Sequence, residues 1–199
     1  MRREKIEELE SLIEEFKTIE KKKLDMPSSF IKSEVYSCTL NNGKTIIREK
    51  ILKQEKDGSA AIILPVTKDN NVILTVEPRV FSKRTAGIGI PAGYIEEGEK
   101  PYLAALRELE EETGYVPNEV ISLGGFYQDM GCSSAYNQTF LALGCEKKKE
   151  QNLDDGEFIK YFDCTYDEAL ELIDGGYIEG CNTIIALEKA KKYLKKGIK

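Results

Sequence analysis

The spacing of apolar residues predicts an amphipathic helix and then a β-hairpin in the first third of the chain. Two partly alternating runs, 31–40 and 44–52, flank Asn41-Asn42-Gly43, and Asn-Gly between such runs is typical of a hairpin turn. We expect the preceding helix to dock on its own domain or on a second subunit. Within residues 4–23, its apolar positions recur at helical intervals among Glu and Lys: Ile6, Leu9, Leu12, Ile13, Phe16 and Ile19.

Short strands and three further helices are predicted for the remainder. The continuous apolar run 60–66 suits a buried strand, and a helix over 101–113 has Pro at its first turn and Gly114 just past its end. A less regular stretch covers 77–89. The other predicted strands are 72–76, 90–95, 120–127, 137–143 and 157–163, and the other predicted helices are 166–174 and 182–195.

Composition narrows the classes of function. The 199 residues are 41% hydrophobic and 32% charged, which suits one sizeable globular core. The net charge of -6 gives no general attraction for nucleic acid or anionic membranes. The chain has no His, which excludes a Ser-His-Asp triad and a His-ligated zinc. Acid–base and metal chemistry must therefore use carboxylates, Lys, Tyr or Cys.

Cysteine usage and the N-terminal sequence indicate a cytoplasmic protein. The five cysteines form no CxxC pair, so structural zinc is not expected. The N-terminus is charged and has no apolar targeting segment, and no apolar run reaches membrane-spanning length. Reduced thiols in a cytosol are the simplest interpretation.

Three acidic residues near the end of the 101–113 helix are the candidate chemistry. Glu108, Glu111 and Glu112 lie within one turn and face the same side. Like charges at these spacings repel, and the C-terminal end of a helix disfavours negative charge. A hard divalent cation with oxygen ligands, magnesium in particular, would compensate. Taken alone, such a run is more often a solvated acidic helix face.

A longer pattern around these acids overturns that interpretation. Written as spacings it is G-x5-E-x7-R-E-U-x-E-E-x-G-U, where U is a bulky apolar residue, and it resembles the Nudix box along its full length. Leu109 fits the first apolar position and Tyr115 fills the last with an aromatic residue. The glycine and polar positions of the box are Gly93, Glu99, Arg107, Glu108, Glu111, Glu112 and Gly114.

The resemblance implies a fold and a set of roles. The Nudix fold is an α+β arrangement, an α/β/α sandwich in which helices enclose a mixed sheet; here an N-terminal helix and β-hairpin extend it. By analogy, Glu108 and Glu112 ligate metal directly, Glu111 ligates a further metal or holds its water, and the carbonyl of Ala92 adds a ligand. The structural positions of the box are Glu99 and Arg107 as a pair, Gly93 for close backbone approach and Gly114 as a helix cap.

Segments outside the box resemble the ADP-ribose pyrophosphatase-like subfamily, notably Ile90 to Glu96 and the tail from Gly176 to Leu187. The resemblance implies a homodimer, with residues 1–55 as the dimerisation element and 56–199 as the Nudix domain. The chain departs from the subfamily at two positions. Met130 stands where a Pro is usual, and Ala135 stands where a loop Glu often positions or deprotonates the attacking water.

The expected reaction is Mg²⁺-dependent hydrolysis, with Mn²⁺ as an alternative, of a nucleoside diphosphate linked to another group. ADP-ribose, giving AMP and ribose 5-phosphate, is the first choice of substrate. Arg79 and Arg84 are candidates for phosphate contact, or for ordinary surface ion pairs. Glu111 is the first candidate base; an acid within 154–157, or ionisation of water by the metal alone, is the alternative. Other nucleotide substrates and a non-catalytic nucleotide sensor are the alternatives; no basic module supports a nucleic-acid partner, and no membrane partner is expected.

Overall fold

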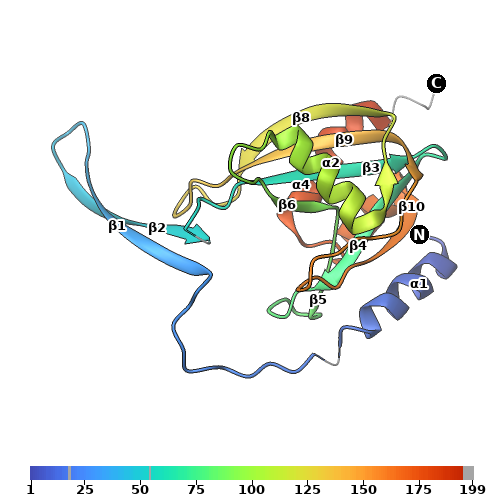
Figure 1. Ribbon diagram of the computed structural model, residues 1–199, viewed down its shortest axis with the longest axis horizontal. Coiled ribbons are helices and arrows are strands. Elements are labelled where there is room, and N and C mark those ends of the chain that lie inside the picture. The colour runs from blue at the N-terminus through green and yellow to red at the C-terminus, as the bar shows by residue number, and fades with distance from the viewer. Residues whose placement is uncertain (18, 54, 195–199) are drawn as a thin grey trace.

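The computed structural model describes residues 1–17, 19–53 and 55–194 as a mixed sheet enclosed by helices, with a separate two-stranded hairpin (Figure 1). The helices are α1 (Arg3–Glu14), α2 (Pro101–Thr113), α3 (Tyr166–Asp174) and α4 (Cys181–Leu194). The strands are β1 (Ile31–Thr39), β2 (Thr45–Lys53), β3 (Ala60–Thr67), β4 (Asn71–Pro78), β5 (Ala86–Gly89), β6 (Ala92–Tyr94), β7 (Tyr115–Val116), β8 (Glu119–Tyr127), β9 (Tyr136–Lys147) and β10 (Lys160–Thr165).

The order of the strands confirms the predicted mixed sheet. Within the described residues, eight strands form one sheet along the path β10-β4-β3-β9-β7, and β5, β6 and β8 pair with β4, β3 and β9. The β3–β9 pair is parallel and the other pairs are antiparallel. β3 and β4 share register at Val66 and Val72 and then take different partners, β6 and β5. The chain between β5 and β6 therefore passes from the strand that pairs with β4 to the strand that pairs with β3.

Both faces of β3 are buried, which explains its continuous apolar run. Ile62, Leu64 and Val66 pack in a core with α1, α3 and α4. Ala61 and Ile63 point to the opposite face and pack in a second core with α2. Because neighbouring side chains on a strand alternate between faces, a strand between two helical layers must be apolar throughout. The apolar sequence of β3 therefore follows from its position between the two helical layers of the α+β sandwich.

The N-terminal helix α1 docks on its own domain. Leu9, Ile13 and Phe16 are buried in the core that also contains α3 and α4. The helix ends at Glu14, whereas the sequence predicted that it continues to residue 23. The prediction was therefore wrong for residues 15–17 and 19–23. Residue 18 lies outside the described residues. A turn after α1 places Phe16, the last side chain of this segment that packs in the core. The residues that follow in the sequence are rich in Lys and have little apolar surface to bury.

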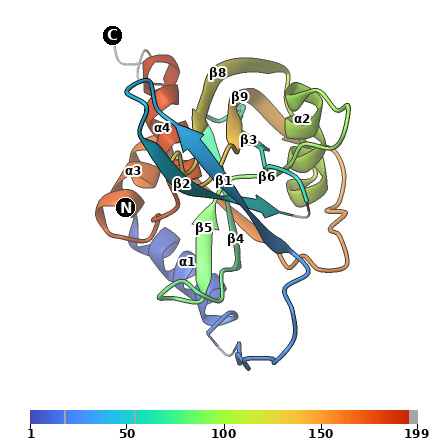
Figure 2. The ribbon, with the colours of Figure 1, turned by 90° about the vertical axis from the view of Figure 1, so that its left-hand side faces the viewer.

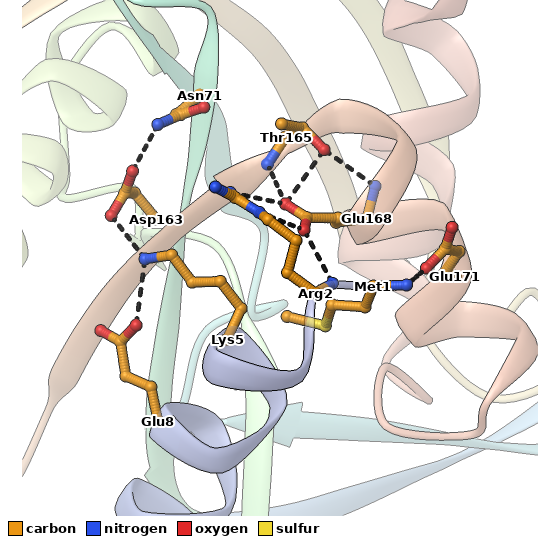
Figure 3. Close-up of polar contacts among 9 residues, drawn as sticks. All are labelled: Met1, Arg2, Lys5, Glu8, Asn71, Asp163, Thr165, Glu168 and Glu171. Carbon is orange, nitrogen blue, oxygen red and sulfur yellow. Dashed lines mark hydrogen bonds and ion pairs between the residues drawn. The ribbon is translucent and has the colours of Figure 1, made fainter.

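Polar contacts fix the start of α1 to α3 (Figure 3). Glu168 accepts hydrogen bonds from the Arg2 guanidinium at 2.9 and 3.2 Å and from the Arg2 backbone N–H at 3.1 Å. The same carboxylate completes the capping box of α3 with Thr165. Lys5 bridges Glu8 and Asp163 at 3.0 and 3.1 Å. One carboxylate therefore ties two helix starts together.

The predicted hairpin forms and projects from the rest of the molecule (Figures 1 and 2). Its register runs from Ile31 opposite Lys53 to Thr39 opposite Thr45, and Gly43 takes a φ of +80° in the turn. At its base, the Ile51 N–H donates to the carbonyl of Cys132 at 2.8 Å. Because α1 packs in the core of the main domain, segment 1–55 is not one separate element. The hairpin is the part of it that projects.

The predicted bounds of α2 and α3 agree with the structure, and the predicted strand over 90–95 is β6. The irregular stretch 77–89 contains one strand, β5, which was not predicted. No helix in the described part of the chain is both long and apolar enough to span a membrane.

Candidate active site

A cavity of about 1240 Å³ lies where α2, β6 and the start of α4 meet. Its wall carries the predicted acids of α2 and the backbone of Ala92 and Gly93. The loop that precedes β10 adds Asp154 and Glu157. The sheet thus brings together segments that are far apart in sequence, and it does so at the acidic turn of α2.

The acids of α2 are unusually buried for charged groups. Glu108 is 7% exposed and Glu112 is 5% exposed, whereas Glu111 is half-buried. Ala105 and Leu109 on the adjoining face of α2 are fully buried against the sheet. Packing of that apolar face turns the neighbouring carboxylates into the cavity instead of into solvent.

Gly93 is required for the approach of Glu108. A Cβ atom on Gly93 would lie 1.9 Å from Oε1 of Glu108, far inside van der Waals contact. The Ala92 N–H donates to Oε1 of Glu112 at 3.4 Å. β6 therefore runs directly beside Glu108 and Glu112.

Arg107 joins the loop of the box to the helix. Its guanidinium donates to both oxygens of Glu99, at 3.0 and 3.2 Å, and to the carbonyl of Tyr94 at 3.2 Å. The same group donates to Glu108 at 2.7 Å and to Glu111 at 3.1 Å. The Arg107 hydrogen bonds lower the pKa of Glu99. The structure thus brings together the two residues that the sequence assigned to a structural pair.

Gly114 ends the helix in the way that the sequence predicts. Its φ of +73° is left-handed, and its N–H donates to the carbonyl of Glu110 at 2.8 Å. A Cβ atom there would lie 2.0 Å from the Lys149 carbonyl. The glycine lets the β9–β10 loop pass close to the end of α2, and this loop leads on to Glu157.

Burial and mutual repulsion disfavour charge on these carboxylates. Burial raises the pKa of Glu112 well above its usual value, and the charges of Glu77 and Glu108 raise it further. The pKa of Glu108 is also raised, first by burial, although Arg107 opposes the shift. No Lys or Arg within 1–17, 19–53 and 55–194 forms an ion pair with Glu112. A bound cation would remove this cost.

Two acids of the cavity were not assigned by sequence reasoning as individual site residues. Glu77, at the end of β4, has its pKa raised by burial and bonds Arg79 at 2.7 Å. Glu157 contributes charge that raises the pKa values of Glu77, Glu108 and Glu112. The acidic composition of 154–157 was the only sequence signal for Glu157, and no local sequence signal indicated Glu77.

The donor set fits a hard divalent cation. Several carboxylates and the residues of β6 border one cavity, and carboxylate and carbonyl oxygen ligands suit Mg²⁺. No three acidic or thiol groups among the described residues converge as a ready cage. Arg107 contacts two of the carboxylates, Glu108 and Glu111, so these would have to reorient to bind metal. Ala92, Glu108, Glu111 and Glu112 remain the predicted ligands.

The two candidate phosphate-binding arginines differ in position. Arg79 lines the cavity beside Glu77. Arg84 lies outside the cavity lining, where it donates to the Gly176 carbonyl and stacks on the Tyr177 ring at 4.8 Å from its centroid. Arg84 therefore holds the α3–α4 loop, and the structure brings only Arg79 of the pair to the acids.

The two departures from the subfamily pattern lie in the β8–β9 loop. Ala135 is fully buried and Met130 is 80% exposed. An alanine can neither accept nor hold a proton through its side chain, so Ala135 cannot be the base.

Comparison with known proteins shows the family of the chain and its fold. The family model for the NUDIX domain matches residues 56–179, more than half of the chain. The chain belongs to the Nudix family. Its fold is shared with a solved ADP compounds hydrolase, with a TM-score of 0.74 and 22% identity over 87% of this chain and 91% of that one.

Two curated relatives cover most of this Nudix protein. An ADP-ribose pyrophosphatase of Bacillus subtilis is 34% identical over 177 residues, which are 87% of this chain and 91% of the relative. A methanol dehydrogenase activator of Bacillus methanolicus is 33% identical over 159 residues, 79% and 83% of the two chains. The chain is thus a Nudix pyrophosphohydrolase.

Proposed function

We propose that this protein hydrolyses ADP-ribose to AMP and ribose 5-phosphate in the presence of Mg²⁺, with Mn²⁺ as an alternative. The observation that carries the proposal is the pair of buried carboxylates in a large cavity, Glu108 against Gly93 and Glu112 beside the Ala92 N–H. The similarity to an ADP-ribose pyrophosphatase supports the choice of substrate. The cytoplasm is the proposed location, since all five cysteines are free thiols.

In this proposal the chain holds a diphosphate and accepts a proton. A divalent cation at the carboxylates supplies charge neutralisation and acidifies water. Arg79 contacts a phosphate oxygen, for which a guanidinium is well suited. Water oxygen forms a bond to one phosphorus, the anhydride P–O bond breaks, and a carboxylate takes the water proton. Positioning and charge stabilisation provide most of the rate gain.

Glu111 and Glu157 are the two candidates for the proton acceptor. Glu111 is held by Arg107 at 3.1 Å, which restricts its availability. Glu157 is exposed on the cavity wall, and its carboxylate accepts a hydrogen bond from the Asp154 N–H at 3.1 Å. A solvent-accessible acid beside a buried acidic cluster suits proton transfer. The accessibility of Glu157 and the contact of Glu111 with Arg107 support Glu157 as the proposed proton acceptor, in place of Glu111.

A substrate panel with Mg²⁺ tests the function. We expect ADP-ribose to have the highest kcat/KM among ADP-ribose, sugar nucleotides, dinucleoside polyphosphates and dinucleotide cofactors, scored by released mononucleotide. Replacement of Glu157 by Gln should lower kcat by about 100-fold or more with little change in metal affinity, whereas Glu112→Gln should weaken metal binding itself. Tight nucleotide binding without turnover would instead support a sensor.

A further inference from the structure

The turn after α1 lies against two loops that border the cavity. In both views of the molecule α1 lies beside β5 (Figures 1 and 2). Residues 15–17 contact the β4–β5 loop, residues 79–85, which carries Arg79, and the loop before β10, which carries Glu157. This turn precedes the segment 56–179 that matches the family model. The two loops are therefore supported by a part of the chain outside that segment.

The ring of Phe16 supports the loop before β10. The Phe16 side chain is 2% exposed and meets the Phe158 ring edge-on, with the ring centroids 5.6 Å apart. Phe158 lines the cavity and directly follows Glu157, the proposed proton acceptor. Because aromatic rings pack edge-to-face in a defined geometry, the contact restricts where the Phe158 backbone can lie. The Phe16 ring therefore helps to fix the backbone that carries Glu157.

The carbonyl of Phe16 supports the β4–β5 loop. It accepts a hydrogen bond from Oγ1 of Thr85 at 2.8 Å, and the same hydroxyl lies 2.6 Å from the Arg84 carbonyl. Thr85 has a φ of +59°, which is unfavourable for a β-branched residue and persists only where the surroundings hold it. The Thr85 carbonyl in turn accepts from the Arg79 N–H at 2.8 Å. The contact with Phe16 therefore fixes the end of the loop that binds the Arg79 backbone.

The position of the Arg79 side chain depends on the same loop. A Cβ atom on Gly87 would lie 2.5 Å from Cγ of Arg79, so the arginine passes directly over the Gly87 backbone. The guanidinium donates to Glu77 at 2.7 Å, beside the acids of the cavity. Lys21, which follows the turn, donates to the Val80 carbonyl at 2.6 Å. A shift of the loop would therefore move Arg79 relative to the acids.

We propose that Phe16 is a positioning residue whose ring sets the place of Glu157 and whose carbonyl, through Thr85, sets the place of Arg79. The proposal rests on the proposed function, because both residues have roles in that reaction. One residue at the end of α1 then holds the proton acceptor and the phosphate contact at a fixed spacing. Since small displacements of reacting groups lower rates steeply, loss of either contact lowers activity although every group that touches substrate is kept.

The first test compares Phe16→Leu with Leu9→Ala, a matched control two turns earlier in α1. Both side chains are buried in the same core. Leu9→Ala leaves the larger cavity and should be the less stable variant. We expect Phe16→Leu nevertheless to lower kcat by about tenfold, while Leu9→Ala keeps the wild-type kcat at a temperature where both are folded. If activity follows stability across the two variants, Phe16 is only a core residue and the inference is wrong.

A cycle with Glu157→Gln tests whether the ring of Phe16 acts through the proton acceptor. Once the carboxylate has been replaced, its exact place no longer matters for proton transfer. Phe16→Leu should therefore cause no further loss of kcat in the Glu157→Gln background. A further tenfold loss in that background, about the same as in the wild-type protein, would contradict the assignment to Glu157.

Thr85 tests the contact made by the carbonyl. Thr85→Val removes the hydroxyl and keeps the branched shape, whereas Thr85→Ser keeps the hydroxyl. We expect Thr85→Val to raise KM by about fivefold with little change in kcat, the loss of one hydrogen bond that orders a phosphate contact, and Thr85→Ser to restore the wild-type KM. In an Arg79→Ala background Thr85→Val should have no further effect. Equal losses in the Val and Ser variants, or a full further loss without Arg79, would overturn the assignment.

Hydrogen exchange without substrate separates this inference from the proposed function. At short labelling times, which report local opening, we expect faster amide exchange in 154–159 for Phe16→Leu and in 79–85 for Thr85→Val. Leu9→Ala should leave both loops unchanged. Unchanged exchange in the loops of the first two variants would overturn the inference even in an active enzyme. If the wild-type protein hydrolyses no substrate while the loops respond as expected, the proposed function fails and the positioning of the two loops stands.

Discussion

At the scale of single residues, the lack of a side chain at Gly93 controls the site. We expect Gly93→Ala to lower kcat/KM by about 100-fold, because the new Cβ atom would displace Glu108 by an ångström or more. Steady-state kinetics with saturating Mg²⁺ measures the loss. Thermal unfolding of the same variant should show lower stability, since the carboxylate and the strand compete for one space.

The double variant Gly93→Ala with Glu108→Ala separates the clash from a general disturbance of β6. Removal of the Glu108 carboxylate frees the space, so stability should return towards that of Glu108→Ala alone while activity stays low. If the double variant is as unstable as the sum of the single variants, contact between these two residues is not the cause.

Glu112 shows how binding capacity and stability conflict at one residue. Burial and neighbouring acids raise the pKa of Glu112, so its charged form destabilises the metal-free fold at neutral pH. We therefore expect Glu112→Gln to raise the stability of the metal-free protein by about 1 kcal/mol and to weaken Mg²⁺ binding. Chemical denaturation with chelator and calorimetry with Mg²⁺ measure the two effects. A less stable metal-free variant would contradict this explanation.

The acids of α2 could be predicted from local sequence, whereas the cavity residues from other elements could be predicted only in part. Glu108, Glu111 and Glu112 lie within one helical turn, so their proximity follows from helix geometry. Glu77 and Glu157 reach the same cavity from β4 and from the loop before β10. Their approach depends on strand order and on the passage of the β9–β10 loop over Gly114, and neither leaves a signal in a short window of sequence.

At the scale of elements, Glu168 links two helices through one charge. Its hydrogen bonds with Arg2, and then with Thr165, hold the pKa of this carboxyl well below its usual value. A lowered pKa in the folded state stabilises the protein above the pKa of the unfolded chain, and this contribution disappears as pH falls through the folded value. We expect Glu168→Gln to cost about 1–2 kcal/mol at pH 7 and progressively less below about pH 4.5.

The matched control for this variant is Asp167→Asn. Asp167 is exposed, lies in the same first turn of α3 and loses the same charge. Denaturant unfolding at several pH values should show a small effect of the control, near the few tenths of a kcal/mol typical of an exposed charge at a helix start. Equal costs for the two variants would assign the effect to the helix dipole and not to the contacts in Figure 3.

The elements that sequence predicted best are those with local end signals. Pro101 and Gly114 bound α2, and the Thr165–Glu168 capping box starts α3. The end of α1 has no such signal: its apolar period continues to Ile19, but the structure turns at Phe16 to bury that ring against the core and Phe158. Tertiary packing overrides the helical pattern there, and no local rule indicates it.

At the scale of the whole molecule, the hairpin presents an apolar stripe that the described chain does not cover. Ile31, Val35 and Ile47 lie on one face of the two strands by register and are 53–68% exposed. A projecting two-stranded ribbon has little stability of its own in water. We therefore keep the prediction that a second copy of the chain covers this face and forms a homodimer.

Sedimentation equilibrium tests the dimer. We expect the wild-type protein to sediment as a dimer, and we expect Val35→Lys combined with Ile47→Lys to shift it to a monomer, because two buried charges in an apolar contact would each cost several kcal/mol. Leu40→Lys, at the hairpin tip and 43% exposed, is the matched control and should remain dimeric. A wild-type monomer at micromolar concentration would refute the predicted role of the hairpin without affecting the site, since the acidic residues that line the cavity belong to the main domain.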